Sequence, residues 1–379
     1  MKPIVTGLAS YGMSGSLFHA PFINIVPDLK LQYIVERTKN LSKEKYPDVR
    51  IIRSFDELIA IPEIELLVVN TPDVTHYEYA KKALLAGKHV VVEKPLVFKV
   101  EEGEELIRLA AEKSLLLCVY QNRRWDGDFL TVQKIVRSGV LGQVVEFSSA
   151  YQRYRNYIQK DTWKEVADGR VGITYNLGAH MVDQTVVLFG MPEAVYADID
   201  RLRTGSQVDD YYHIQLIYSA KLKVSLRASY LVMEETPRYY IHGTEGSFIK
   251  YGIDPQEEYL KTGVLSPLNS DWGKEDETNW GILHTLINNM HYRGKVETVR
   301  GDYTQFYHEI VNALRNGKTP STAASNVIGV IKIIEAALES ATTKKAIRIN
   351  GKYLYSILIN FSASSAALHP LPAAVTACR

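Results

Sequence analysis

A lysine that directly follows an apolar segment is the first residue whose type and position could do chemistry. Lys94 lies between Glu93 and Pro95, immediately after the run at residues 89–92. Such a run is typical of a buried parallel strand, and ligands of parallel sheets bind beyond the carboxyl ends of the strands. An ammonium group there could donate a hydrogen bond to a substrate oxygen and share in proton transfer. A solvated lysine is the other interpretation, and the local pattern leaves both open.

A second polar segment follows another apolar run, at residues 66–70. It contains Thr71, Pro72 and His76. Since carboxyl ends of parallel strands meet at one edge of a sheet, we expect these residues near Lys94, around a bound cofactor. A hydrogen bond at the start of the next helix is the alternative role for His76.

A glycine-rich loop follows the first apolar strand. It is a partial match to the dinucleotide fingerprint G-x-G-x-x-G, with Ser10 where the first glycine belongs. If that position needs a positive φ, serine costs on the order of 1 kcal/mol. Glycines in such a loop let backbone N–H groups approach a pyrophosphate. The residues expected to bind the cofactor here are Tyr11, Gly12, Met13, Ser14 and Gly15.

The second strand ends in an acid and a base. Glu36 lies twenty-one residues after Gly15, where a carboxylate can accept hydrogen bonds from the adenosine ribose of NAD. Arg37 beside it could instead hold the 2′-phosphate of NADP. A solvated charge pair at a strand end is the remaining alternative.

Two kinds of pattern divide the chain. Residues 1–125 alternate apolar strands with helical segments, which predicts an α/β Rossmann domain with a doubly wound parallel sheet. The predicted strands lie at 4–5, 31–35, 66–70, 89–92 and 115–120, and two of the helices at 77–85 and 101–113.

From residue 126 to 350 the pattern predicts an α+β domain with an open, mostly antiparallel sheet and helices. Its strands are expected at 144–154, 195–202, 211–218 and 224–231, and its helices at 129–137, 177–189, 303–315 and 325–342. Residues 351–379 form an appended tail that has no Asp, Glu, Lys or Arg from 353 to 378, and its prolines and polar residues argue against a membrane helix.

Composition limits the class of protein. Hydrophobic residues are 46% and charged residues 23%, as in ordinary globular chains, and the net charge of +1 offers no footprint for nucleic acid or acidic membranes. Two cysteines and no secretory leader predict a cytoplasmic protein. No metal site is expected, because no Cys/His cluster has zinc spacing; His284 and His291 lie seven apart on what could be a helix. The 24 tyrosines fit cross-strand pairs or, in our interpretation, an oligomer interface.

Several motifs together resemble one family. They are the glycine loop, Thr71-Pro72 with His76, Ala86-Gly87-Lys88-His89-Val90, Glu93-Lys94-Pro95 and Gly178-Ala179-His180. With these motifs the chain resembles the Gfo/Idh/MocA oxidoreductases over residues 3–349. Further segments resemble the scyllo-inositol dehydrogenase branch: Phe18-His19-Ala20-Pro21, 121–126, Asp209-Asp210-Tyr211, 243–248 and 254–257.

The resemblance implies roles for individual residues. Lys94 would contact the reacting hydroxyl or carbonyl, and His180 would be the general acid/base. Glu93, Asn122 and Trp125 would bind the cofactor. Arg123, Arg124 and Trp125 would edge the cofactor cleft, although they could instead pack the domain junction, and for Trp125 the two roles are equally supported. Substrate contacts would come from Lys94, Arg124, Asp126 and His180.

One position departs from the family pattern. The family usually has an aspartate four residues before the histidine, and here it is Asn176. Asparagine can hydrogen-bond but cannot stabilise an imidazolium by charge, so we predict a lower pKa for His180 than in relatives, or a preference for binding the carbonyl side. We include Asn176 in the predicted catalytic set.

The implied activity is that of an NAD(P)-dependent dehydrogenase acting on a cyclic polyol or sugar, with the Val-Glu-Arg strand end favouring NADP over NAD. The resemblance also implies a homo-oligomer, a dimer or tetramer, formed through the second sheet. The alternatives are an aldose or anhydro-sugar dehydrogenase and, in another class, a non-catalytic dinucleotide-binding sensor of the same fold.

Overall fold

The first sheet consists of six parallel strands in the order β3-β2-β1-β4-β5-β6, the order of a Rossmann fold. A computed structural model describes residues 2–160, 162, 165, 172–219 and 221–349, so the predicted tail at 351–379 lies outside the described residues. The strands are β1 (Ile4–Leu8), β2 (Leu29–Val35), β3 (Arg50–Ile52), β4 (Leu66–Val69), β5 (His89–Val92) and β6 (Leu117–Val119). The prediction of a doubly wound parallel sheet is confirmed.

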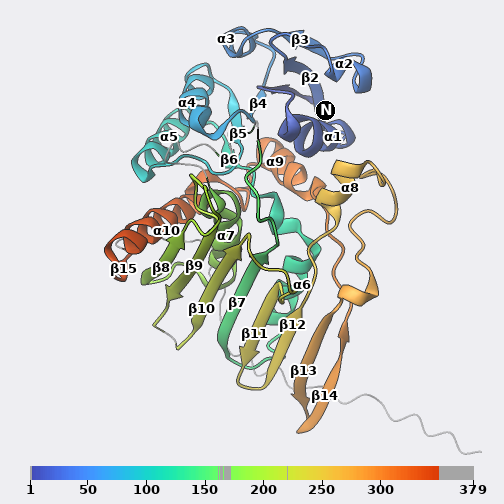
Figure 1. Ribbon diagram of the computed structural model, residues 1–379. Coiled ribbons are helices and arrows are strands. Elements are labelled where there is room, and N and C mark those ends of the chain that lie inside the picture. Colours follow the sequence, from blue (N-terminus) through green and yellow to red (C-terminus); the bar gives the residue numbers. More distant parts are fainter. Residues whose placement is uncertain (1, 161, 163–164, 166–171, 220, 350–379) are drawn as a thin grey trace, which may run out of the picture.

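Helices cover both faces of this sheet (Figure 1). They are a π-helical turn η1 (Ser14–His19) continued by α1 (Ala20–Ile25), then α2 (Ser42–Lys45), α3 (Phe55–Ile59), α4 (His76–Leu85) and α5 (Val100–Glu112). All four residues of β4 are buried, as a strand covered on both sides requires. Strands β2 and β3 are added on one side of β1, and β4 to β6 on the other. The loops after β1 and β4 therefore meet at the switch point where such folds bind ligands.

The second sheet has nine strands in the order β14-β13-β12-β11-β7-β10-β9-β8-β15. Only β7 and β10 pair in parallel; the other neighbours are antiparallel, as predicted. The strands are β7 (Val144–Gln152), β8 (Ala194–Asp200), β9 (Tyr211–Ile217), β10 (Lys223–Ser229), β11 (Tyr239–Gly243), β12 (Gly246–Lys250), β13 (Gly281–Ile287), β14 (Met290–Val296) and β15 (Ile347–Arg348).

The two faces of this sheet differ in character. One is a buried row that crosses seven strands, made by Val195, Leu216, Val224, Phe147, Ile241, Phe248 and Leu283. The adjacent register row faces the other way, with Tyr196, Gln215, Ser225, Ser148, Tyr240, Ile249, Ile282 and Lys295. The tyrosines are divided between the faces, because Tyr212 and Tyr239 are buried whereas Tyr196 and Tyr240 are each 36% exposed.

Helices of the second half lie behind the sheet or join it to the first (Figure 1). They are α6 (Gly127–Arg137), a π-helical turn η5 (Thr174–Gly178) continued by α7 (Ala179–Phe189), α8 (Gln256–Thr262), α9 (Thr304–Asn316) and α10 (Ala324–Thr343). α9 returns to the first sheet, where its Phe306, Tyr307 and Ile310 share a core with Phe22 and Leu66. None of the helices in the described ranges is long and apolar enough to cross a membrane.

The expectation of a helix around His284 and His291 is wrong. The two histidines lie on β13 and β14, which form a hairpin around Asn288 and Asn289 at φ 50° and 62°. A two-residue turn with positive φ at both positions matches the twist of paired strands, so the segment folds as a hairpin. In the part of the chain that the structure describes, no three His, Cys, Asp or Glu side chains are grouped to hold a metal ion.

Candidate active site

Ser10 ties the glycine loop to the loop after β4. Its backbone N–H donates to Oδ1 of Asn70 at 3.0 Å, its hydroxyl donates to the Asn70 carbonyl at 2.9 Å, and Asn70 Nδ2 donates back to the Ser10 carbonyl at 2.9 Å. Ser10 is not among the residues with positive φ. The conformational penalty considered for a serine here is therefore absent, and the serine side chain contributes a bond that glycine lacks.

Gly15 is the glycine that this loop requires on steric grounds. A Cβ at this position would lie 2.2 Å from the Ser10 carbonyl oxygen and 2.7 Å from Asn70 Nδ2. At Gly12 the nearest atom to an added Cβ would be Ser10 Oγ at 3.9 Å, so Gly12 borders open space. The loop is closed on the protein side and open at Gly12 and the exposed Met13, which fits a dinucleotide whose phosphates approach the backbone.

Glu36 turns inward instead of facing the cleft. Its Oε2 accepts the Leu41 N–H at 2.8 Å, and its Oε1 accepts the N–H and hydroxyl of Ser42 at 2.9 Å and 2.5 Å. Arg53 fixes the same loop by donating to the Glu36 carbonyl at 2.8 Å. Arg37, by contrast, is exposed at the carboxyl end of β2.

His76 links two of the predicted segments. It is fully buried, and its Nδ1 lies 2.7 Å from the Pro95 carbonyl oxygen while its Nε2 lies 3.1 Å from that of Thr71. The ring therefore holds the loop after β4 against the loop after β5. The structure brings Thr71, Pro72 and His76 to the same sheet edge as Lys94 and gives His76 a bridging position instead of a helix-start bond.

Glu93 is a point where several donors converge. Its Oε1 accepts from the Ser14 hydroxyl and lies 3.1 Å from His19 Nε2, and its Oε2 accepts the Lys94 N–H at 3.1 Å. Burial acts to raise the pKa of the Glu93 carboxyl, but the hydrogen bond and charge of His19 and the bond from Ser14 outweigh burial and lower it to about 2. Glu93 is therefore a carboxylate at any working pH.

Lys94 reaches from the first sheet to the second half of the chain. Its Nζ lies 3.0 Å from both the carbonyl oxygen and the side-chain Oδ1 of Asn176. Asn176 lies in η5, and His180 lies four residues further on, in the first turn of α7. The sequence-predicted catalytic residues thus occupy one helix and one adjoining loop.

His180 is a buried, neutral imidazole. It is 5% exposed, and among the described residues its Nδ1 has no hydrogen-bond partner. Burial is the main reason that the pKa of His180 lies well below its usual range. The positive charges of Lys94, Arg123 and Arg238 lower the pKa further. A pKa of His180 below that of relatives, caused by Asn176, stays a prediction.

The residues after β6 have mainly protein partners. Arg124 forms a two-pronged ion pair with Asp183 of α7 at 2.7 Å and 2.6 Å and donates to the Ser321 carbonyl at 2.7 Å. Asp126 is fully buried and accepts from the Tyr303 hydroxyl at 2.7 Å. These contacts give Arg124 and Asp126 a structural role, and their contact with substrate stays a prediction.

Trp125 and Asn122 lie in a short 3₁₀ turn, η3 (Asn122–Trp125), at the carboxyl end of β6. The Trp125 ring meets Phe306 of α9 edge to face at 5.9 Å, which supports the junction-packing interpretation without testing a cofactor contact. Asn122 is buried beside Gln121, whose Oε1 has no partner among the described residues.

Some supporting residues could not be anticipated from the sequence. Asp209 accepts the Thr174 N–H at 2.7 Å and so anchors the start of the helix that holds Asn176 and His180. Its only sequence signal was the Asp209-Asp210 pair, which carried no role. His19 and Tyr307, 288 positions apart, also meet beside Glu93.

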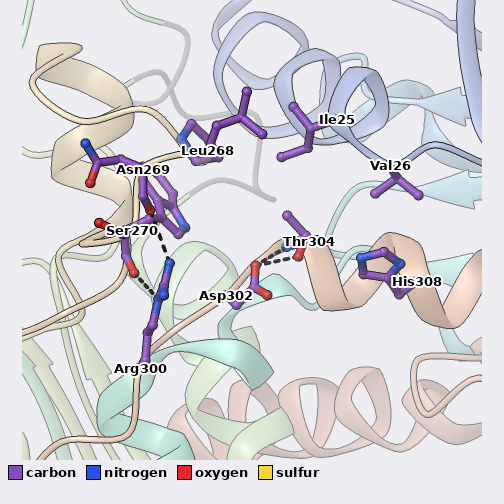
Figure 2. A pocket seen from close by; sticks show the side chains of 11 residues that line it. Ile25, Val26, Leu268, Asn269, Ser270, Arg300, Asp302, Thr304 and His308 are labelled. Carbon is purple, nitrogen blue, oxygen red and sulfur yellow. Dashed lines mark hydrogen bonds between the residues drawn. The ribbon is translucent and has the colours of Figure 1, made fainter.

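A cavity of about 310 Å³ lies away from this edge, between the end of α1, the loop at Asn269 and the start of α9 (Figure 2). Arg300 lines it and donates to the backbone oxygens of Trp272 and Asn269. Its described lining includes none of the residues predicted to bind cofactor or substrate.

Replacing Asn176 with aspartate tests the electrostatics of His180. The added carboxylate opposes the cationic surroundings, so the pKa of His180 rises and the acid limb of the kcat/KM profile moves up by on the order of one pH unit. Asn316→Asp, at an exposed site in α9, is the matched control and leaves the profile in place. Superimposable profiles for Asn176→Asp and the wild type would remove this account.

The lowered pKa of His180 also makes the stability of the folded protein depend on pH. The unfolded chain binds the histidine proton more tightly than the folded chain, so His180 costs stability progressively as the pH falls below about 6.5.

A Rossmann sheet with a closed glycine loop is joined through the Lys94–Asn176 contact to the helix of a buried histidine on a second, open-sheeted unit. This arrangement defines the class of two-domain dinucleotide-binding oxidoreductases. Two family models match the chain: "Oxidoreductase family, NAD-binding Rossmann fold" over residues 4–121 and "Oxidoreductase family, C-terminal alpha/beta domain" over residues 133–349. The chain belongs to the Gfo/Idh/MocA oxidoreductase family.

Relatives match over nearly the whole described chain. The scyllo-inositol 2-dehydrogenase (NADP(+)) IolW of Bacillus subtilis is 39% identical over 91% of this chain and 96% of its own length. The uncharacterized oxidoreductase YdgJ of Escherichia coli is 38% identical over 89% and 96%. A solved structure of a putative oxidoreductase from Bacteroides fragilis is 50% identical, with a TM-score of 0.85 over 92% of this chain and 100% of that chain.

Proposed function

We propose that the protein is an NADP-dependent dehydrogenase that transfers a hydride between the nicotinamide and a secondary alcohol of a cyclic polyol or sugar, with an inositol-like ring as the first candidate. The observation that carries this proposal is the contact of Lys94 with Asn176, which places an ammonium group one helical turn from the buried His180. The name of the IolW relative supports the substrate class and the cofactor.

The two side chains divide the proton chemistry. When a secondary alcohol is oxidised, its hydroxyl proton must leave as the hydride departs from carbon. Lys94 donates a hydrogen bond to that oxygen, and the neutral His180 accepts the proton. The bound nicotinamide supplies the hydride acceptor, and in the opposite direction His180 returns the proton.

The substrate test is direct. NADP and NAD are offered separately with scyllo-inositol, myo-inositol and glucose, and the absorbance of reduced nicotinamide is followed. The proposal predicts turnover with an inositol and NADP. Turnover with glucose alone would favour an aldose dehydrogenase, and tight cofactor binding with no turnover of any sugar, anhydro-sugars included, would favour a sensor.

The orientation of Glu36 supports NADP. A carboxylate that accepts three hydrogen bonds from Leu41 and Ser42 is poorly placed to bind the ribose hydroxyls that distinguish NAD. The inward orientation of Glu36 also directs its negative charge away from the expected position of a 2′-phosphate. Arg37, the next residue, is exposed and could bind that phosphate.

Arg37→Ala is therefore expected to raise the KM for NADP about tenfold, as loss of a charge-assisted bond to phosphate requires. The KM for NAD is expected to change less than about twofold, since NAD has no phosphate at that position. Lys30→Ala, an exposed position near the other end of β2, is the control and leaves both constants unchanged. Equal effects of Arg37→Ala on the two cofactors would contradict the assignment.

The exposed face of the second sheet supports a homo-oligomer. Tyr196, Ile217 and Tyr240 are 36–40% exposed on strands whose other face is buried, and aromatic residues are enriched at interfaces. We expect a dimer or tetramer by analytical ultracentrifugation, and dissociation on Tyr240→Glu without loss of folded structure. A monomeric wild-type protein would contradict this part of the proposal.

A further inference from the structure

A buried line of hydrogen bonds connects α9 with the dinucleotide site. The Tyr307 hydroxyl of α9 lies 2.6 Å from His19 Nδ1, and His19 Nε2 lies 3.1 Å from Glu93 Oε1. His19 and Tyr307 are fully buried. The His19 ring also lies 4.3 Å from the ring of Tyr120, whose hydroxyl donates to the Phe18 carbonyl at 2.6 Å. Packing and hydrogen bonds therefore hold the imidazole from three sides.

The carboxylate fixes one end of this line. Glu93 can only accept, so His19 Nε2 donates to it. The Tyr307 hydroxyl can donate or accept, so it is a partner for His19 Nδ1 in either case: it donates to Nδ1 of a neutral ring and accepts from Nδ1 of a charged one. Tyr307 in this way holds the ring in the orientation that directs Nε2 at Glu93.

Glu93, which His19 holds in place, in turn binds the glycine loop and the backbone of Lys94. Its Oε1 also accepts from Ser14 in the glycine loop, and its Oε2 accepts the backbone N–H of Lys94. Three protein donors use the two carboxylate oxygens, which suits Glu93 to fixing the loop and the lysine in place. A helix that is contributed by the far end of the chain is thereby coupled to both segments.

We propose that His19 and Tyr307 are positioning residues of the dinucleotide site, which orient Glu93 so that Ser14 and the Lys94 backbone are held in the binding arrangement. They act through Glu93 and do not themselves touch the cofactor. The proposal uses the dinucleotide binding of the family and does not depend on which sugar is the substrate.

Tyr307→Phe isolates the hydroxyl. The probes are NADPH and NADH, titrated separately without substrate and followed by nucleotide fluorescence. Loss of one buried hydrogen bond in the line is expected to weaken binding of both about three- to tenfold. Tyr303→Phe is the matched control, because Tyr303 is also fully buried at the start of the same helix but donates to Asp126. It is expected to lower the unfolding temperature and leave both dissociation constants within about twofold.

His19 supplies an independent pair of variants. His19→Gln keeps a donor for Glu93 and an acceptor for Tyr307, so most of the affinity is expected to remain. His19→Leu removes both and is expected to weaken binding more than about tenfold. This pair also serves if Tyr307→Phe fails to fold.

Nucleotide affinities of Tyr307→Phe and His19→Leu equal to those of the wild type, with only the unfolding temperature lowered, would overturn the proposal and leave a structural role alone. Equal losses of affinity in Tyr307→Phe and Tyr303→Phe would overturn it as well. Failure of the dehydrogenase proposal would show as absent turnover with these affinity differences intact, so the two failures are distinguishable.

Discussion

Lys94→Met is expected to lower kcat/KM about 10³-fold while NADPH binds within about threefold of its wild-type affinity. In the proposed mechanism the ammonium group donates to the reacting oxygen, and its Nζ lies 3.0 Å from two oxygens of Asn176. Methionine retains the length and apolar contacts of the side chain but cannot donate a hydrogen bond. The loss therefore falls on the reaction and not on the cofactor, and steady-state kinetics with direct nucleotide titration separates the two.

Lys88 provides the control for removing a buried lysine that has backbone partners. Its Nζ donates to the backbone oxygens of Ile61 and Pro62 at 2.7 Å and 3.2 Å, neither of which is a predicted site residue. Lys88→Met is expected to lower the unfolding temperature and leave kcat/KM of the folded enzyme near the wild-type value. Full turnover by Lys94→Met would refute the role assigned to Lys94.

Gly15→Ala is expected to abolish measurable NADPH binding and to cost about 1–3 kcal/mol of stability. Its Cβ would meet the Ser10 carbonyl oxygen at 2.2 Å, a backbone atom that can move only if the Ser10–Asn70 bonds are strained. The loop that is expected to bind the pyrophosphate is then displaced.

Gly12→Ala separates binding from stability. The added methyl has no contact closer than 3.9 Å within the protein, so stability is expected to change by less than about 0.5 kcal/mol. The same methyl lies where the phosphates of the cofactor are expected to approach the backbone of the loop, so the affinity for NADPH is expected to fall. Normal NADPH affinity in Gly15→Ala would show that this loop is not the phosphate site.

The strands could be predicted where the pattern of apolar residues along the sequence reflects which faces of the strand are buried. β4 and β5 are continuous apolar runs because both faces are covered, and β7 to β10 alternate because one face is buried. β14 escaped prediction because this edge strand is exposed along most of its length and has no such alternation. β3 has only three residues, too few for a periodic signal.

The candidate site was predictable only for residues that directly follow a recognisable strand. Lys94 and Glu93 follow a recognisable strand, so their place at the sheet edge could be read from the chain. The inward turn of Glu36 depends on the folding of the loop at Leu41 and Ser42, which the Val-Glu-Arg pattern does not specify. The meeting of His19 with Tyr307 depends on α9 packing against the first sheet, which no local spacing encodes.

The central claim is hydride transfer between a ring carbon and the nicotinamide, and an isotope measurement tests it most directly. scyllo-Inositol that is deuterated at its ring carbons is incubated with the protein and NADP, and the reduced cofactor is recovered and examined by mass spectrometry and NMR. The account predicts NADPH that contains one deuterium at C4 of the nicotinamide, and no such product with Lys94→Met. Tight NADP binding without deuterium transfer from this or any other cyclic polyol or sugar would contradict the claim and identify a binding protein instead of a dehydrogenase.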